Sequence, residues 1–233
     1  RRVQVVLTST VLVTHLLGIV GAVGLQWVLL PTDDLLHGRY RVPALVVTPI
    51  VVVVTVVFGL SWLTWVVHRW LRWPDENRAP TVSEQLICLV VPWRLTVLTT
   101  ALWVIGGAVT VTAYARVEPA VVPVLATAVL ICGLLASGLG YLVAEVALRP
   151  LTAIAFKAGT LPDRPFIGIR ARLIGIWVIA IALPMLALVN LAVYSVSGDD
   201  LPVERMAVLL GFIGVGGIIV SIAGGWLLVT AML

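Results

Sequence analysis

Six long apolar stretches constrain this chain more than any other feature of its sequence. Roughly 20 consecutive apolar residues cross the hydrocarbon core of a bilayer as a helix. The stretches cover about Val3–Leu30, Val42–Val67, Leu95–Tyr114, Ala120–Leu148, Leu173–Tyr194 and Met206–Leu233. Runs such as Val51–Val57 show no alternation, which excludes the strands of a transmembrane barrel. The sequence therefore predicts an all-α polytopic membrane protein, a bundle of six transmembrane helices arranged as three hairpins.

The composition supports lipid as the solvent of these helices. Of the 233 residues, 61% are hydrophobic and 11% are charged, whereas about 25% of a soluble domain is charged. The first apolar stretch is too long for a secretory signal and lacks a small-residue cleavage site, so we interpret it as a true span. The apolar run that reaches Leu233 has no basic stop, and we expect the sequence to be part of a longer protein.

Basic residues give the expected orientation of the bundle, because they gather in cytoplasmic loops. Eleven fall on one side of the predicted spans: Arg1, Arg2, Arg69, Arg72, Arg78, Arg94, Arg149, Lys157, Arg164, Arg170 and Arg172. Four fall on the other: Arg39, Arg41, Arg116 and Arg205. Both chain ends are therefore expected in the cytoplasm, and topology explains the basic excess without nucleic acid. A further group is typical of interfacial anchors: Trp62, Trp65, Trp70, Trp73 and Trp93.

Acidic residues fall in all three predicted outer loops. Oxygen ligands from several loops suit a hard divalent cation. The candidate metal ligands are Asp33, Asp34, Asp199, Asp200 and Glu118, with His37 a ligand only for a softer metal. The alternative is a set of solvated acids that pair with the four outer arginines.

Small residues at four-residue spacing mark places where helices can approach closely in lipid. Gly217, Ser221 and Gly225 form such a stripe in the sixth stretch, which we interpret as a dimer contact. The pairs Gly133/Ser137 and Ala136/Gly140 in the fourth stretch favour packing within one bundle.

Few ionisable side chains lie within the predicted spans, which argues against a transporter or a proton pump. His15 is either a hydrogen-bonded packing residue or a sensor of pH or ligand. Cys88 and Cys132 are too far apart in sequence to indicate a disulfide framework or a metal site. The sequence has no phosphate loop and no nucleophile elbow. We expect no catalytic residue in this segment.

The segment that follows the fourth stretch is more distinctive. Arg149-Pro150 and the amphipathic turn that ends at Gly159 resemble the first helix of a HAMP linker, and Pro150 suits a first helical turn. Glu145–Pro150 and Pro165–Trp177 together resemble the membrane domain of actinobacterial class III adenylyl cyclases.

The resemblance implies six spans in a bacterial plasma membrane, with a HAMP linker and one cytoplasmic cyclase domain expected after residue 233. It also implies a homodimer that makes cyclic AMP from ATP, with magnesium or manganese as the cofactor of that domain. None of the family's catalytic residues has a counterpart here. The alternatives are a non-enzymatic six-span protein, such as a transporter subunit, and the input domain of another signalling enzyme, such as a histidine kinase.

Overall fold

The computed structural model describes residues 2–157, except Asp75 and Asn77, and scattered positions between 185 and 226. Four long helices dominate this part: α1 (Arg2–Leu29), α3 (Thr48–Trp70), α4 (Val82–Ala115) and α5 (Val122–Lys157). Short elements join them: α2 (Thr32–Leu36), a π-helical turn (Pro43–Val47) and a 3-10 turn (Pro119–Val121). The described residues contain no strand, so the prediction of an all-α fold is confirmed for them.

Four segments are long and apolar enough to cross a membrane: Gln4–Leu29, Pro43–Trp70, Val82–Ala115 and Pro119–Ala155. Large apolar side chains on their outer surfaces are more than half exposed, among them Val20, Phe58 and Ile105. Such a surface is compatible with lipid. The predicted fifth and sixth spans lie outside the described residues, apart from scattered positions.

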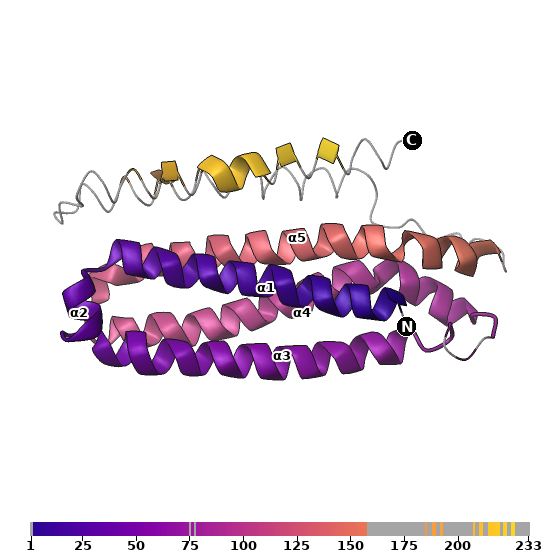
Figure 1. The fold of residues 1–233 in the computed structure, drawn as a ribbon, viewed down its shortest axis with the longest axis horizontal. Coiled ribbons are helices and arrows are strands. Elements are labelled where there is room, and N and C mark those ends of the chain that lie inside the picture. Colours follow the sequence, from indigo (N-terminus) through magenta and orange to yellow (C-terminus); the bar gives the residue numbers. More distant parts are fainter. Residues whose placement is uncertain are drawn as a thin grey trace.

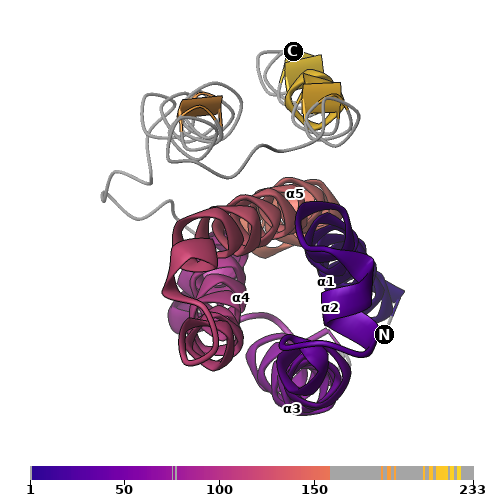
Figure 2. The ribbon, with the colours of Figure 1, turned by 90° about the vertical axis from the view of Figure 1, so that its left-hand side faces the viewer.

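The four helices run antiparallel to their neighbours (Figure 1). They form a ring in which α1 contacts α3 and α5, and α4 contacts the same two helices (Figure 2). The start of α1, the end of α3, the start of α4 and the end of α5 share one end of the bundle. We call it the basic end, because it carries Arg69, Arg72, Arg78, Arg94 and Arg149. The turns after α1 and α4 form the opposite end.

Two apolar cores hold the bundle, one near each end. The core at the basic end contains Leu7, Val67, Leu71, Val91 and Leu148 among its fully buried side chains. The core at the opposite end includes Leu29, Leu35, Tyr40, Tyr114 and Leu125. Between these cores, the middle of the bundle contains polar as well as apolar side chains.

Helix α4 begins well before the expected third span, at Val82 rather than near Leu95. Thr81 caps its first turn: the Glu84 backbone N–H donates to the Thr81 hydroxyl, and the Thr81 backbone N–H donates to the Glu84 carboxylate. This capping box satisfies two backbone donors that a helix start leaves unpaired. Cys88, which precedes the expected start of the third span, is therefore a buried residue of α4.

Helix α5 continues through Pro150 to Lys157, so Pro150 lies inside a helix and not in the first turn of a new one. A proline in a helix interior removes one backbone hydrogen bond. The helix persists because Leu148, Leu151 and Ala155 stay buried in the core at the basic end. The Gln85 side chain also donates to the Ala155 carbonyl at 2.9 Å, which joins α4 to this part of α5.

Small residues bring α1, α4 and α5 close together around one indole ring. A Cβ added to Gly18 would lie 2.7 Å from Trp103 Cζ2 and 2.8 Å from Ala136 Cβ. A Cβ on Gly133 would lie 2.9 Å from the same indole. Gly140 faces Thr14, with 3.4 Å from an added Cβ to the Thr14 hydroxyl oxygen. The pairs predicted for the fourth stretch therefore pack within one bundle.

We expect Gly18→Ala to destabilise the bundle by about 1–3 kcal/mol, because the new methyl group overpacks a contact that includes the Cys132 backbone oxygen. Gly24→Ala in the same helix is the matched control, since a Cβ at Gly24 meets nothing within 4 Å. Thermal unfolding of both variants in one detergent measures the difference. Equal midpoints would contradict the close approach at Gly18.

Candidate functional site

Polar side chains occupy the middle of the bundle, between the two apolar cores. The Trp103 indole N–H of α4 donates to His15 Nδ1 of α1 at 3.1 Å. The two ring centroids are 5.3 Å apart, with a 60° angle between the ring planes. Because Nδ1 accepts this bond, the neutral imidazole carries its proton on Nε2. The hydrogen-bonded packing role predicted for His15 is present in the structure.

A second polar contact lies nearer the opposite end. Gln26 of α1 donates from its side-chain nitrogen to the Tyr114 hydroxyl of α4. Tyr114 is fully buried, and its ring centroid lies 5.7 Å from that of the equally buried Tyr40. The hydrogen bond joins α1 to α4, and the ring contact joins α4 to the segment that leads into α3.

A cavity of about 70 Å³ lies between these two contacts, and all four long helices line it. Its polar lining consists of His15, Gln26, Thr48, Thr55, Trp103 and Thr110. The Thr55 hydroxyl donates to the Val51 carbonyl at 2.8 Å, which leaves the oxygen able to accept a bond from a guest molecule. One water needs about 10–15 Å³ of such volume, so the cavity holds a few waters or one small neutral molecule.

The side chains that line this cavity are mostly apolar. Among the side chains that line it, His15 is the one ionisable group. A conduction path for ions places several ionisable or coordinating groups at membrane depth. His15 lines the cavity, and its sensory role stays a prediction.

The acidic residues at the opposite end meet an arginine. Arg39 Nη1 lies 2.7 Å from a Glu118 carboxylate oxygen, and Arg39 Nε lies 3.4 Å from one of Asp34. The described residues contain no group of three or more His, Cys, Asp or Glu side chains placed to hold a metal. Asp199 and Asp200 lie outside the described residues, so the five-ligand cation site stays a prediction. For Asp34 and Glu118, the alternative of arginine partners is what the structure shows.

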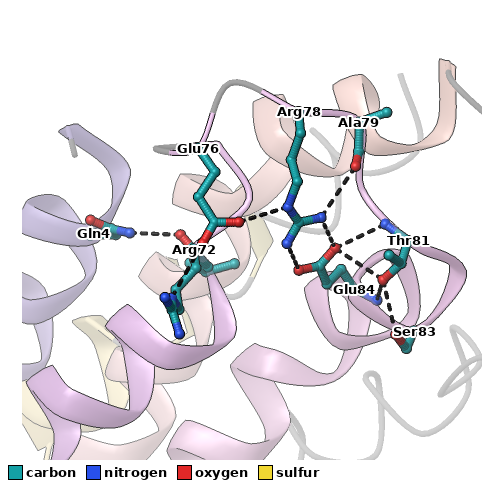
Figure 3. Close-up of polar contacts among 9 residues, drawn as sticks. Gln4, Arg72, Glu76, Arg78, Ala79, Thr81, Ser83 and Glu84 are labelled. Carbon is teal, nitrogen blue, oxygen red and sulfur yellow. Dashed lines mark hydrogen bonds and ion pairs between the residues drawn. The ribbon is translucent and has the colours of Figure 1, made fainter.

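A network of polar contacts lies at the basic end, in the segment that connects α3 to α4 (Figure 3). Arg78 forms two hydrogen bonds to the Glu84 carboxylate, at 2.7 and 2.5 Å, and a third to Glu76 at 2.6 Å. These bonds, first those to Glu84, raise the pKa of Arg78 above its ordinary value. At the same end of the bundle, the Gln4 side chain donates to the Leu71 carbonyl at 2.7 Å and so joins α1 to the end of the neighbouring α3. The network around Arg78 joins the segment between α3 and α4 to the first turn of α4.

The predicted dimer stripe falls on scattered described positions. Gly217, Ser221 and Gly225 are helical, and Ser221 and Gly225 are exposed. A Cβ on Gly225 would meet nothing within 4 Å, whereas one on Gly216 would lie 3.8 Å from a methyl group of Leu135 in α5. The described residues leave the face of Ser221 and Gly225 uncovered, and its dimer role stays a prediction.

Several residues of this interior were not predicted from the sequence. Gln4, Gln26 and Gln85 each donate across helices, but a lone glutamine in an apolar run has no signature that identifies its partner. The sequence around Trp103 also has no signature that identifies His15 as its partner. The spacing of Thr81 and Glu84 is the pattern of a capping box and could have placed the start of α4.

Comparison with known proteins finds relatives in mycobacteria. The uncharacterized protein Rv1319c of Mycobacterium tuberculosis is 27% identical over 228 residues, which cover 97% of this chain and 43% of the relative. The uncharacterized protein Rv1318c of the same organism is 31% identical over 185 residues, which cover 79% of this chain and 34% of the relative. The uncharacterized protein Mb1354c of Mycobacterium bovis is 27% identical over 194 residues, or 83% of this chain and 34% of the relative.

This chain therefore spans less than half the length of these relatives, which carry most of their sequence outside the matched region. No family model matches the chain. No solved structure matches it.

We expect Trp103→Phe to destabilise the bundle by about 0.5–1.5 kcal/mol, because it removes the donor to His15 and keeps an aromatic ring in place. Trp62→Phe is the control, since Trp62 is an exposed side chain of α3. A double-mutant cycle with His15→Phe isolates the pair, and the loss at Trp103 should shrink once His15 is absent. Full additivity of the two substitutions would show that the hydrogen bond contributes nothing.

Proposed function

We propose that this chain is the membrane anchor and sensory domain of a receptor-type adenylyl cyclase. The observation that carries the proposal is the continuity of α5, which runs from Val122 through Arg149-Pro150 to Lys157 without a break. The described part of the segment that resembles a HAMP helix, residues 149–157, is a direct continuation of the long apolar helix α5. A shift or rotation of α5 within the bilayer would reach Lys157 without an intervening hinge.

The packing at the basic end supports this coupling. Leu148, Leu151 and Ala155 lie in the same buried cluster as Leu7 of α1 and Val91 of α4. The bond from Gln85 to the Ala155 carbonyl adds a polar tie between α4 and α5. Movement of α5 is therefore shared with its neighbours, which is the property that an input domain requires.

The interior cavity is the candidate input site within this proposal. It touches all four helices and contains polar groups that can bind a small molecule or water. A ligand that binds one arrangement of α1, α4 and α5 more tightly shifts the population toward it. His15 is the candidate sensory residue, because it lines the cavity and bonds to Trp103.

The remaining parts of the proposal rest on the sequence. The basic end faces the cytoplasm under the positive-inside rule, with six spans in a bacterial plasma membrane and both chain ends inside. The cyclase domain after residue 233 would bind ATP with magnesium or manganese, and two chains would combine to make cyclic AMP. The length of the mycobacterial relatives outside the matched region leaves room for such a domain.

The test uses the complete reading frame, including the residues that follow Leu233. We expect a HAMP linker and a cyclase domain there, and we expect expression in bacteria that lack their own adenylyl cyclase to restore cyclic AMP. A kinase core or a stop soon after residue 233 would end the proposal. So would the absence of cyclic AMP from a well-expressed complete protein supplied with manganese.

The proposed homodimer predicts the effect of crowding the sixth stretch. In the complete protein, Gly217→Ile together with Gly225→Ile should reduce cross-linking between chains and lower cyclic AMP formation, because the added side chains push the helices apart. Gly211→Ile is the control, since Gly211 is exposed and lies outside the stripe. Unchanged cross-linking in the double variant would remove this stripe from the dimer contact.

A further inference from the structure

Helices α3 and α4 carry a group of tryptophan and arginine side chains at the basic end. We call it the tryptophan–arginine surface, made of Trp62, Trp65, Arg69, Trp70, Trp93 and Arg94. The Arg69 guanidinium carbon lies 5.7 Å from the centroid of the Trp65 ring, and that of Arg94 lies 5.2 Å from the Trp70 ring. The second pair crosses from α4 to α3, so the surface spans the seam between the two helices.

The two arginines differ from other arginines of the bundle in their partners. Arg72, Arg78 and Arg39 each form an ion pair with a carboxylate. In the part of the chain that the structure describes, Arg69 and Arg94 have aromatic partners and no ion pair with an acid. A guanidinium that lies over an indole keeps its N–H donors free at its edge, where they suit the oxygens of a phosphate. The surface therefore has positive charge without a counter-charge of its own.

An aromatic stripe on α3 leads from the apolar part of the helix to Arg69. Phe58, Trp62, Trp65 and Arg69 follow at spacings of four, three and four residues, which places them on one helix face. The rings of Phe58 and Trp62 are 6.1 Å apart, and Phe58 and Trp65 are about 60% exposed. An extended apolar chain can lie along this face with its polar end at the arginine.

We propose that the tryptophan–arginine surface is a binding site for one anionic phospholipid. Arg69 and Arg94 bind the phosphate of the headgroup, and an acyl chain lies along Phe58, Trp62 and Trp65. Charge complementarity selects this occupant, because an exposed cationic pair next to an apolar, aromatic stripe at the end of a membrane-crossing helix matches a lipid and not a soluble anion. The site is independent of the output domain that the chain serves.

The rival explanation is a diffuse field, in which every exposed arginine at the basic end attracts anionic lipid equally. The test is native mass spectrometry of the purified chain with phosphatidylglycerol or phosphatidylcholine added in steps. We expect the wild-type chain to retain phosphatidylglycerol preferentially. Arg69→Gln together with Arg94→Gln should weaken that binding by roughly 25-fold, about fivefold for each arginine. Phosphatidylcholine binding should hardly change.

Matched control variants distinguish binding at this one site from diffuse attraction by all the exposed arginines. Arg72→Gln makes the same charge change three residues from Arg69, and Arg41→Gln with Arg116→Gln makes the double change at the opposite end. We expect these controls to change phosphatidylglycerol binding by less than about twofold. Losses equal to those of the Arg69 and Arg94 variants would overturn the proposal in favour of a diffuse field.

Two further measurements keep the assignment falsifiable. Arg69→Lys with Arg94→Lys preserves the charge that orients the chain and removes the planar guanidinium, so its affinity for phosphatidylglycerol should be intermediate. Wild-type affinity in this lysine variant would overturn a site built on guanidinium geometry. An excess of inorganic phosphate should not displace the lipid, because free phosphate makes no contact with the stripe, and displacement would overturn the lipid assignment.

Discussion

The rest of the bundle depends on how three helices close around the Trp103 indole. Gly18 of α1 and Gly133 of α5 have no side chain, and the indole of α4 occupies the space that their Cβ atoms would take. In lipid, such contacts supply much of the attraction between helices, because apolar burial alone gains little there. The same ring donates to His15, so the contact that sets the helix spacing also orients the polar group beside the cavity.

The polar ties lie at three levels along the bundle: two join α1 to α4, one joins α1 to the end of α3, and one joins α4 to α5. Gln4 and Gln85 act at the basic end, His15 with Trp103 in the middle, and Gln26 with Tyr114 toward the opposite end. Each tie gives a hydrogen-bond partner to a polar atom that would otherwise be removed from water without one. The ties also specify one arrangement of apolar helices that could otherwise slide past each other.

The fold could be predicted further from the sequence than the site could. Apolar length predicts the four described helices, and small-residue spacing predicts the packing of α5. The prediction that Pro150 begins a new helix was wrong. Whether a helix continues through Pro150 depends on the burial of Leu151 and Ala155, and that burial follows from tertiary packing. The interior site was missed for the same reason. Gln26, Thr55 and Trp103 are ordinary in sequence, and their common cavity follows only from how four helices assemble.

The lengths of α4 and α5 have a consequence for the boundary between lipid and water. Helices of 34 and 36 residues extend for about 50 Å at 1.5 Å per residue, whereas the hydrocarbon core is about 30 Å thick. In a bilayer of that thickness, an upright helix of this length would extend about 20 Å into the headgroup layers or beyond them. At the basic end, the charged side chains of Arg78 and Glu84 at the start of α4 suit a position outside the hydrocarbon core.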